Sequence, residues 1–307
     1  MEKQNTPRGG QNKYQLPLGS AAGGLSFSAT VIVNLIISII ASAVISLASL
    51  KGTDAAKYIS VLVSPIAIAV ILTLTLKIVK QPSRAIMPLK THPKYFIIGV
   101  LLIFGLLFSL NSLNEYLIKL FELTGYQRRE TFVPDVTGWK IVPALLVIAV
   151  LPAIFEEIMF RGILLNNAEE GAGTVRAIFL SGLCFSLYHG SVEQTVYQFI
   201  CGCLFAFLAV RSRSVAPTVV IHFLNNAVIL VLMACGLLDD GGALIMPKTA
   251  EITVSVLSSV SLIGAVVWLI LDKKELKKCR EDGVKLFFVF AAVGIGAMVL
   301  MWIAGLF

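Results

Sequence analysis

Three ionisable side chains interrupt one long apolar segment of the chain. The stretch LPAIFEEIMFRGILL, residues 151–165, contains Glu156, Glu157 and Arg161 among side chains that are typical of a membrane span. An ionisable group inside a span costs about 2.5–3.5 kcal/mol on insertion scales, so such groups are functional candidates by default. We therefore look for reactive side chains first among the residues of this segment.

Helical geometry predicts different roles for the two glutamates. Glu157 and Arg161 are four residues apart with the acid nearer the N-terminus, which is the favoured orientation for a helical ion pair. Glu156 lies about 100° around the helix from Glu157. One turn away from Glu156 stand only Pro152 and Phe160, which carry no charge. We therefore predict a structural ion pair and, at Glu156, a carboxylate that is free to react.

Two further apolar segments carry polar groups at one-turn spacing. FSLYHG places Phe185 one turn before His189, where the aromatic ring can shield or orient the imidazole. HFLNNA places His222 and Asn226 on one helical face, whereas Asn225 is out of register and is interpreted as a packing residue. We expect these groups to share a buried cavity with the free carboxylate.

A carboxylate, two imidazoles and a carboxamide in one cavity suit hydrolysis. Glutamate and histidine are common general bases for water, and imidazole or amide N–H groups can hydrogen-bond a tetrahedral oxyanion. The sequence contains neither the GxSxG motif of a serine nucleophile nor an HExxH zinc site.

The three motifs EEIMFR, FSLYH and HFLNN occur in this order, each on its own predicted span. In this respect the chain resembles the CAAX protease and bacteriocin-processing (CPBP/Abi) family of intramembrane proteases, which includes the type II CAAX prenyl endopeptidases. The resemblance covers roughly residues 140–236, and the chain matches at every motif position. It implies an intramembrane endopeptidase.

The resemblance also implies roles for individual residues. Glu156 would be the catalytic glutamate with His189 helping to activate water, and the oxyanion would be stabilised by His222 and Asn226. Glu157, Arg161 and Phe185 would support the site. No cofactor is expected under this glutamate-dependent mechanism. A metal-dependent mechanism has also been argued for the family, in which case Glu156, His189 and His222 would be zinc ligands.

The composition predicts an all-α, polytopic membrane bundle of about eight to nine transmembrane helices. Of 307 residues, 57% are hydrophobic and only 14% are charged, and the mean hydropathy is +0.87. Soluble domains are about 45–50% apolar and about 25% charged. The apolar runs predict spans at 26–49, 58–76, 95–111, 141–165, 177–190, 192–209, 215–236, 252–271 and 286–306.

The chain divides into four predicted parts around the motifs. These are a cytoplasmic N-terminal tail (1–25), N-terminal transmembrane helices with an external amphipathic segment (26–139), a catalytic core (140–236) and C-terminal transmembrane helices (237–307). The turn after the fifth span, YHGSVEQ, is expected inside the protein rather than in free solvent.

The distribution of Lys and Arg predicts the orientation. With the N-terminus in the cytoplasm, cytoplasmic segments hold 18 of the 25 basic residues and external segments hold 7. The segment LNEYLIKLFELTG reads as an amphipathic helix on the outer membrane surface. The five cysteines show neither metal-type spacing nor a disulfide framework, and the CGC at 201–203 is interpreted as small-residue helix packing.

Two other functional classes stay open at this point. One is a non-catalytic immunity or scaffold protein of the same family, and the other is a proton-coupled transporter. The expected partners are membrane lipids and a membrane-associated peptide or protein substrate. Nucleic acid is not expected, because the basic residues lie in short loops between spans. The expected location is a bacterial plasma membrane, and the sequence indicates no oligomeric state.

Overall fold

The computed structural model describes residues 19–79, 87–123, 125–127, 133–238, 244–279 and 282–306. Within these ranges the regular elements are helices, apart from one isolated bridge between Leu238 and Leu244. Eight helices are long and apolar enough to cross a membrane, and Thr174–Tyr188 is a shorter apolar helix. The chain is therefore an all-α, multi-pass membrane bundle, and the predicted count of eight to nine spans is confirmed.

In the described part of the chain, the helices are joined by turns and irregular segments and by the one isolated bridge. The first four are α1 (Gly19–Leu47), α2 (Asp54–Val79), α4 (Lys94–Ser109) and α5 (Asn111–Glu122). A continuous segment follows, made of η1 (Gly138–Lys140), α6 (Ile141–Ala144), η2 (Leu145–Val150), α7 (Leu151–Glu157), η3 (Ile158–Leu164) and α8 (Leu165–Ala172). The last five are α9 (Thr174–Tyr188), α10 (Thr195–Ser212), α11 (Ala216–Ala234), α12 (Lys248–Leu271) and α13 (Gly283–Ala304).

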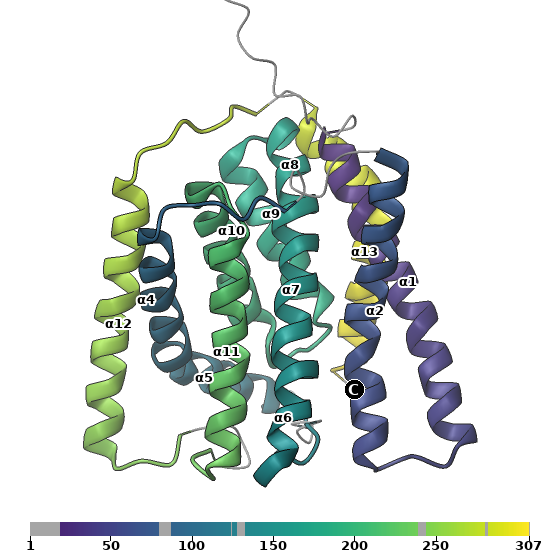
Figure 1. The fold of residues 1–307 in the computed structure, drawn as a ribbon, viewed down its shortest axis with the longest axis vertical. Helices are drawn as coiled ribbons and strands as arrows, with labels where there is room; N and C mark the ends of the chain where they lie inside the picture. Colours follow the sequence, from purple (N-terminus) through teal and green to yellow (C-terminus); the bar gives the residue numbers. More distant parts are fainter. Residues whose placement is uncertain are drawn as a thin grey trace, which may run out of the picture.

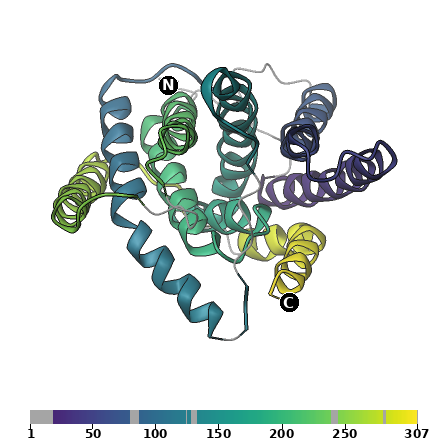
Figure 2. The same cartoon turned by 90° about the horizontal axis from the view of Figure 1, so that it is seen from below.

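The helices that carry the motifs lie in the middle of the bundle. Helices α1, α2 and α13 pack on one side of them, and α4 with α12 on the other (Figures 1 and 2). Glycines allow the closest approaches in these flanking groups. A Cβ at Gly24 of α1 would lie 2.2 Å from the Phe287 carbonyl oxygen of α13, and one at Gly105 of α4 would lie 2.5 Å from Leu262 of α12. The two ends of the chain thus form the walls of the motif-bearing core.

The first helix begins earlier than hydropathy predicted, at Gly19 rather than at residue 26. Its first turns are rich in small residues, which lower hydropathy but fit against neighbouring backbone. Gly23 lies against the backbone of Leu164 and Ala168, and the Ser20 hydroxyl donates to the Ala168 carbonyl. Close packing of small residues therefore extends this span. Of the predicted tail, residues 1–18 lie outside the described residues.

Helix α7, which carries both glutamates, stands between two π-helical segments, η2 and η3. π segments inside longer helices are uncommon and occur often at functional sites. Pro152 lies in the first turn of α7 and Pro217 in the first turn of α11, where a missing N–H group is tolerated. The predicted single span at 141–165 is therefore a helix whose register changes on either side of the glutamates.

The connections fall into two groups at opposite ends of the bundle (Figure 1). Residues 87–93, 213–215 and 272–279 lie at one end, as their shared basic character predicts. Helix α5, predicted as amphipathic, turns away from the axes of the spans at the other end (Figure 2). The choice of which end faces the cytoplasm stays a prediction.

Two native cysteines can test this orientation. Cys235 follows α11 and Cys279 follows α12, one crossing later, and both are exposed. In variants that retain only one of them, an impermeant maleimide should label Cys235 in intact cells and Cys279 only after permeabilisation. Labelling of Cys279 in intact cells would reverse the predicted orientation.

Candidate active site

A buried ion pair with a histidine joins two of the motifs. Arg161 Nη1 lies 3.0 Å from Glu157 Oε1, as the four-residue spacing predicts, and both side chains are completely buried. The same carboxylate oxygen lies 2.9 Å from His222 Nδ1 of α11. Because a carboxylate paired with arginine only accepts hydrogen bonds, the His222 Nδ1–H group is the donor. This leaves His222 Nε2 as the ring nitrogen available to another partner.

Arg161 also joins this pair to α10. Its Nη2 donates to the Gly202 carbonyl at 3.3 Å, and its guanidinium lies 4.4 Å from the ring centroid of Phe185. Gly202 is the centre of the CGC segment and faces Gly182 of α9, whose Cα would lie 2.8 Å from an added Cβ. The CGC segment is thus a close helix contact, as its small residues predicted, and it brings a carbonyl to the arginine.

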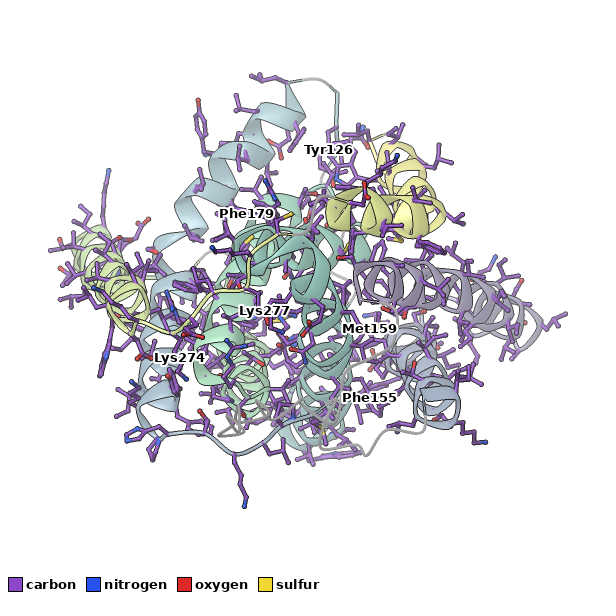
Figure 3. All side chains as sticks on the ribbon, turned by 90° about the horizontal axis from the view of Figure 1, so that it is seen from above. Tyr126, Phe155, Met159, Phe179, Lys274 and Lys277 are labelled. Atoms are coloured by element: carbon purple, nitrogen blue, oxygen red, sulfur yellow. The ribbon has the colours of Figure 1, made fainter. Side chains whose placement is uncertain are left out.

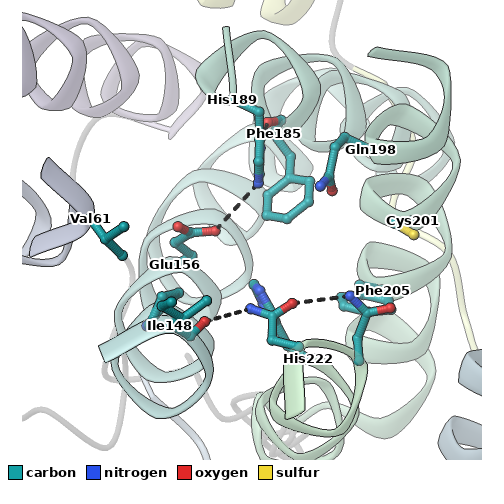
Figure 4. A pocket seen from close by; sticks show the side chains of 12 residues that line it. Val61, Ile148, Glu156, Phe185, His189, Gln198, Cys201, Phe205 and His222 are labelled. Atoms are coloured by element: carbon teal, nitrogen blue, oxygen red, sulfur yellow. Dashed lines mark hydrogen bonds and ion pairs between the residues drawn. The ribbon is translucent and has the colours of Figure 1, made fainter. Parts of the chain in front are cut away.

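Glu156 points into a different environment from its neighbour. Its side chain is 8% exposed, and its Oε1 lies 3.4 Å from the Ser64 hydroxyl of α2. Its Oε2 has no hydrogen-bond partner among the described residues and lies 4.0 Å from His189 Nε2 (Figure 4). Glu156 is therefore the less compensated of the two carboxylates.

His189 stands at the end of α9 with one ring nitrogen occupied. Its Nδ1 lies 2.8 Å from the Phe185 carbonyl oxygen, which can only accept, so Nδ1 carries a proton. The Phe185 ring packs against the imidazole with centroids 4.7 Å apart. In this neutral tautomer Nε2 is an acceptor that faces Glu156, so both groups can accept protons from one water molecule.

The turn after His189 packs inside the protein, as predicted for YHGSVEQ, although Gln194 is exposed. Trp302 of α13 donates to the Thr195 hydroxyl at 2.7 Å, and the Tyr126 hydroxyl lies 2.6 Å from Glu193 Oε1. The short α9 therefore ends within the bundle, and its terminal histidine reaches the motif helices.

Asn226 belongs to a chain of hydrogen bonds across three helices. Its Nδ2 donates to the Ile148 carbonyl at 3.0 Å, and its Oδ1 accepts from Asn225 Nδ2 at 3.0 Å. Asn225 Oδ1 in turn accepts from the Tyr197 hydroxyl at 3.0 Å. An amide nitrogen carries two protons, so Asn226 keeps one N–H group for another acceptor.

These groups surround one cavity of about 170 Å³. Its lining comes from α2, η2, α7, α9, α10 and α11: Val61, Ile148, Pro152, Glu156, Phe185, His189, Gln198, Cys201, Phe205, His222, Asn225 and Asn226. Figure 4 shows Glu156 and His189 facing each other, with His222 on a neighbouring wall. The predicted catalytic set, Glu156, His189, His222 and Asn226, therefore shares one chamber.

Comparison with known proteins bears on this chamber directly. The family model described as Type II CAAX prenyl endopeptidase Rce1-like matches residues 138–228, from η1 into α11. That range contains all three motifs. Residues 138–228 are thus similar to the CAAX proteases. This similarity supports intramembrane protease activity in general, and the helices of the matched range supply most of the cavity wall.

A relative supports the same assignment over a longer stretch. The chain is 27% identical over 187 residues to the membrane-embedded CAAX protease MroQ of Staphylococcus aureus (strain USA300). The alignment covers 58% of this chain and 74% of the relative. No solved structure matches the chain.

Some residues around the candidate site were not predicted. Ser64 contacts Glu156 from α2, outside the matched range, and Gln198 and Asn225 line the cavity. The signals available were weak, because a serine in a span usually bonds its own helix. Asn225 was interpreted as a packing residue, but its amide instead holds that of Asn226.

The zinc alternative does not fit the side chains as they stand. Glu156, His189 and His222 all line the cavity, yet no group of three His, Cys, Asp or Glu in the described ranges is arranged to hold a metal ion. We therefore derive no catalytic step through a metal.

Loss of Arg161 should destabilise the core of motif-bearing helices. Arg161→Ala leaves Glu157 buried without its cation, at a cost of about 3–5 kcal/mol. The expected result is a lower yield of folded protein and a lower Tm in detergent, measured beside activity. A variant with wild-type Tm but no activity would instead place Arg161 in catalysis or substrate binding.

Proposed function

We propose that this CAAX protease is an active endopeptidase in which Glu156 and His189 activate water to cleave a membrane-associated peptide or protein. The observation that supports this most is the facing pair of acceptors, Glu156 Oε2 and His189 Nε2, 4.0 Å apart in the cavity wall. A water between them would be oriented by both and would lose a proton to one of them. Because the relative is a membrane-embedded protease of a bacterium, the proposed location is a bacterial plasma membrane.

The first step is attack of this water on the scissile carbonyl carbon. As the new C–O bond forms, Glu156 takes a proton from the water, and His189 holds the oxygen through its second hydrogen bond. The carbonyl π electrons move to oxygen and form a tetrahedral oxyanion. Glu156 suits this role because it has only the weak Ser64 contact and the neighbouring imidazole as partners.

The oxyanion would be bound on the wall formed by α11. Asn226 donates the N–H group that the Ile148 carbonyl does not use. His222 donates from Nε2 when its ring is doubly protonated, while Nδ1 stays on Glu157. Donors fixed in advance in this way stabilise developing charge without reorganising.

Collapse of the intermediate completes hydrolysis. The C–N bond breaks as the carbonyl re-forms, and the leaving nitrogen takes the proton held by Glu156, directly or through His189. Glu156 returns to its carboxylate form, so the cycle needs no other co-reactant than water. The immediate products are a carboxylic acid and an amine.

Glu156→Gln should nearly abolish cleavage while leaving folding intact. The amide keeps the size of the carboxylate but cannot act as a base, and general-base catalysis typically contributes about 10²–10⁴-fold. Turnover can be measured by comparing peptides released in cells or vesicles with wild type and variant. Cys201→Ser changes another cavity-lining group, one that the mechanism does not use, and should retain activity.

Three outcomes would contradict the mechanism. Full activity of Glu156→Gln would remove Glu156 from catalysis. Inactivity of both wild type and variant, with equal peptide binding, would favour the non-catalytic scaffold. Activity lost in chelator and restored specifically by zinc would move Glu156, His189 and His222 to metal ligands.

Asn226→Asp should slow cleavage by about 10²–10³-fold, the usual loss for one oxyanion donor. The substitution keeps the shape of the side chain but replaces its N–H donors with an acceptor. The loss should appear in kcat more than in KM. Asn225→Ala, which removes only a neighbour of Asn226, should cost less than Asn226→Asp, and an equal or larger cost would contradict the assignment of the donor to Asn226.

A further inference from the structure

A second polar cluster lies at the end of the bundle that is predicted to be cytoplasmic, away from the cavity. Lys94 opens α4, Arg211 stands in the last turn of α10, and Lys274 lies in the connection after α12. Lys94 Nζ and Lys274 Nζ each lie 5.0 Å from the centroid of the Tyr95 ring, on which they converge. Two helices and one connection thus bring three cations together, since Arg211 Nη1 donates to the Lys274 carbonyl.

The carboxylate that pairs with this cluster is Asp272, through Lys94. Asp272 accepts from Lys94 Nζ at 3.0 Å and from the Tyr95 hydroxyl at 2.6 Å, and these contacts hold its pKa below the usual value. Three cations against one carboxylate leave a surplus of two positive charges. The exposed Glu275 makes no ion pair with them among the described residues.

Arg211 is the least compensated member. It is 7% exposed, and its Nε has no hydrogen-bond partner. Its Nη1 reaches only the Lys274 carbonyl, at 3.4 Å, and its guanidinium lies 5.1 Å from the Phe207 ring centroid. A buried cation without a carboxylate is costly unless another anion is bound nearby.

The adjacent basic residues are balanced, which sets this cluster apart. Arg213 and Lys277 lie 3.4 Å and 3.3 Å from the buried Glu169 carboxylate, and Lys277 also pairs with Glu170. Two cations there meet two carboxylates. Figure 3 shows Lys277 over the centre of this end and Lys274 to one side, nearer α12.

Exposed apolar side chains lie beside the surplus positive charge. Ile97, Trp268 and Leu271 are exposed apolar side chains on α4 and α12, within about one turn of the cluster. The Lys94 side chain is 32% exposed, so its ammonium can be reached from outside. Basic pockets between helices at a membrane surface are where anionic headgroups bind.

We propose that Lys94, Arg211 and Lys274 bind the phosphate of an anionic lipid headgroup, with its acyl chains against α4 and α12. The two ammonium groups supply donors from the exposed side, and Arg211 supplies fixed positive charge behind them. Charge-assisted hydrogen bonds to phosphate are among the stronger polar contacts. The lowered pKa of Lys274, caused by partial desolvation and nearby cations that outweigh Asp272, agrees with a site that favours an anion.

The test uses the purified full-length protein in neutral detergent. Short-chain phosphatidic acid should raise Tm in a saturable way, and short-chain phosphatidylcholine should not. Lys94→Gln with Lys274→Gln should weaken the phosphatidic acid effect about 30-fold, from the usual contribution of each cation near a headgroup. Lys274→Gln alone, in an exposed connection, should weaken it about 5-fold if the double variant folds poorly.

The control is Lys273→Gln with Lys278→Gln, which removes the same charge from exposed positions in the same connection. It should keep the wild-type response. An equal loss in the control, or no response of wild type to phosphatidic acid, would overturn the site. An equal response to inorganic phosphate would overturn the assignment to a lipid.

Discussion

The cost of holding Glu157 as an anion where water is scarce constrains the whole core. Its carboxylate is completely buried, and it is compensated from η3 by Arg161 and from α11 by His222. Arg161 also reaches the Gly202 carbonyl on α10. Since a buried charge without partners is strongly destabilising, these contacts fix how two motif helices meet each other and α10. The same contacts orient the His222 ring toward the cavity.

Compensation of Glu157 leaves its neighbour as the carboxylate that is proposed to react. Glu156 follows the same backbone but faces α2 and α9, where it meets one hydroxyl and one imidazole. Two adjacent carboxylates therefore acquire different chemistry from their surroundings, a pattern seen in enzymes that use paired carboxylates. Helix α2, which lies outside the family match, contributes Ser64 and Val61 to this environment.

Features local to one helix could be predicted from the sequence, whereas contacts between helices far apart in the chain could not. Hydropathy located the spans, and the four-residue spacing predicted the pairing of Glu157 with Arg161, because both signals are local to one helix. The contact of Glu157 with His222 and that of Glu156 with Ser64 join helices far apart in the chain. No single-helix pattern contains them. The early start of α1 was not predicted for a related reason. Gly23 and Gly24 stabilise this part of the helix only by packing closely against other helices.

Pro152 links the irregular helix to the proposed oxyanion site. It has no N–H group, so it cannot donate to the Ile148 carbonyl four residues earlier, as an α-helix would require. That carbonyl instead accepts from Asn226 Nδ2, and Asn225 holds the oxygen of the same amide. Both ends of the Asn226 amide are thereby fixed before substrate arrives, and its second N–H group is left for the cavity. The α-helical hydrogen bond that Pro152 cannot make thus leaves a carbonyl, that of Ile148, which orients the Asn226 N–H donor.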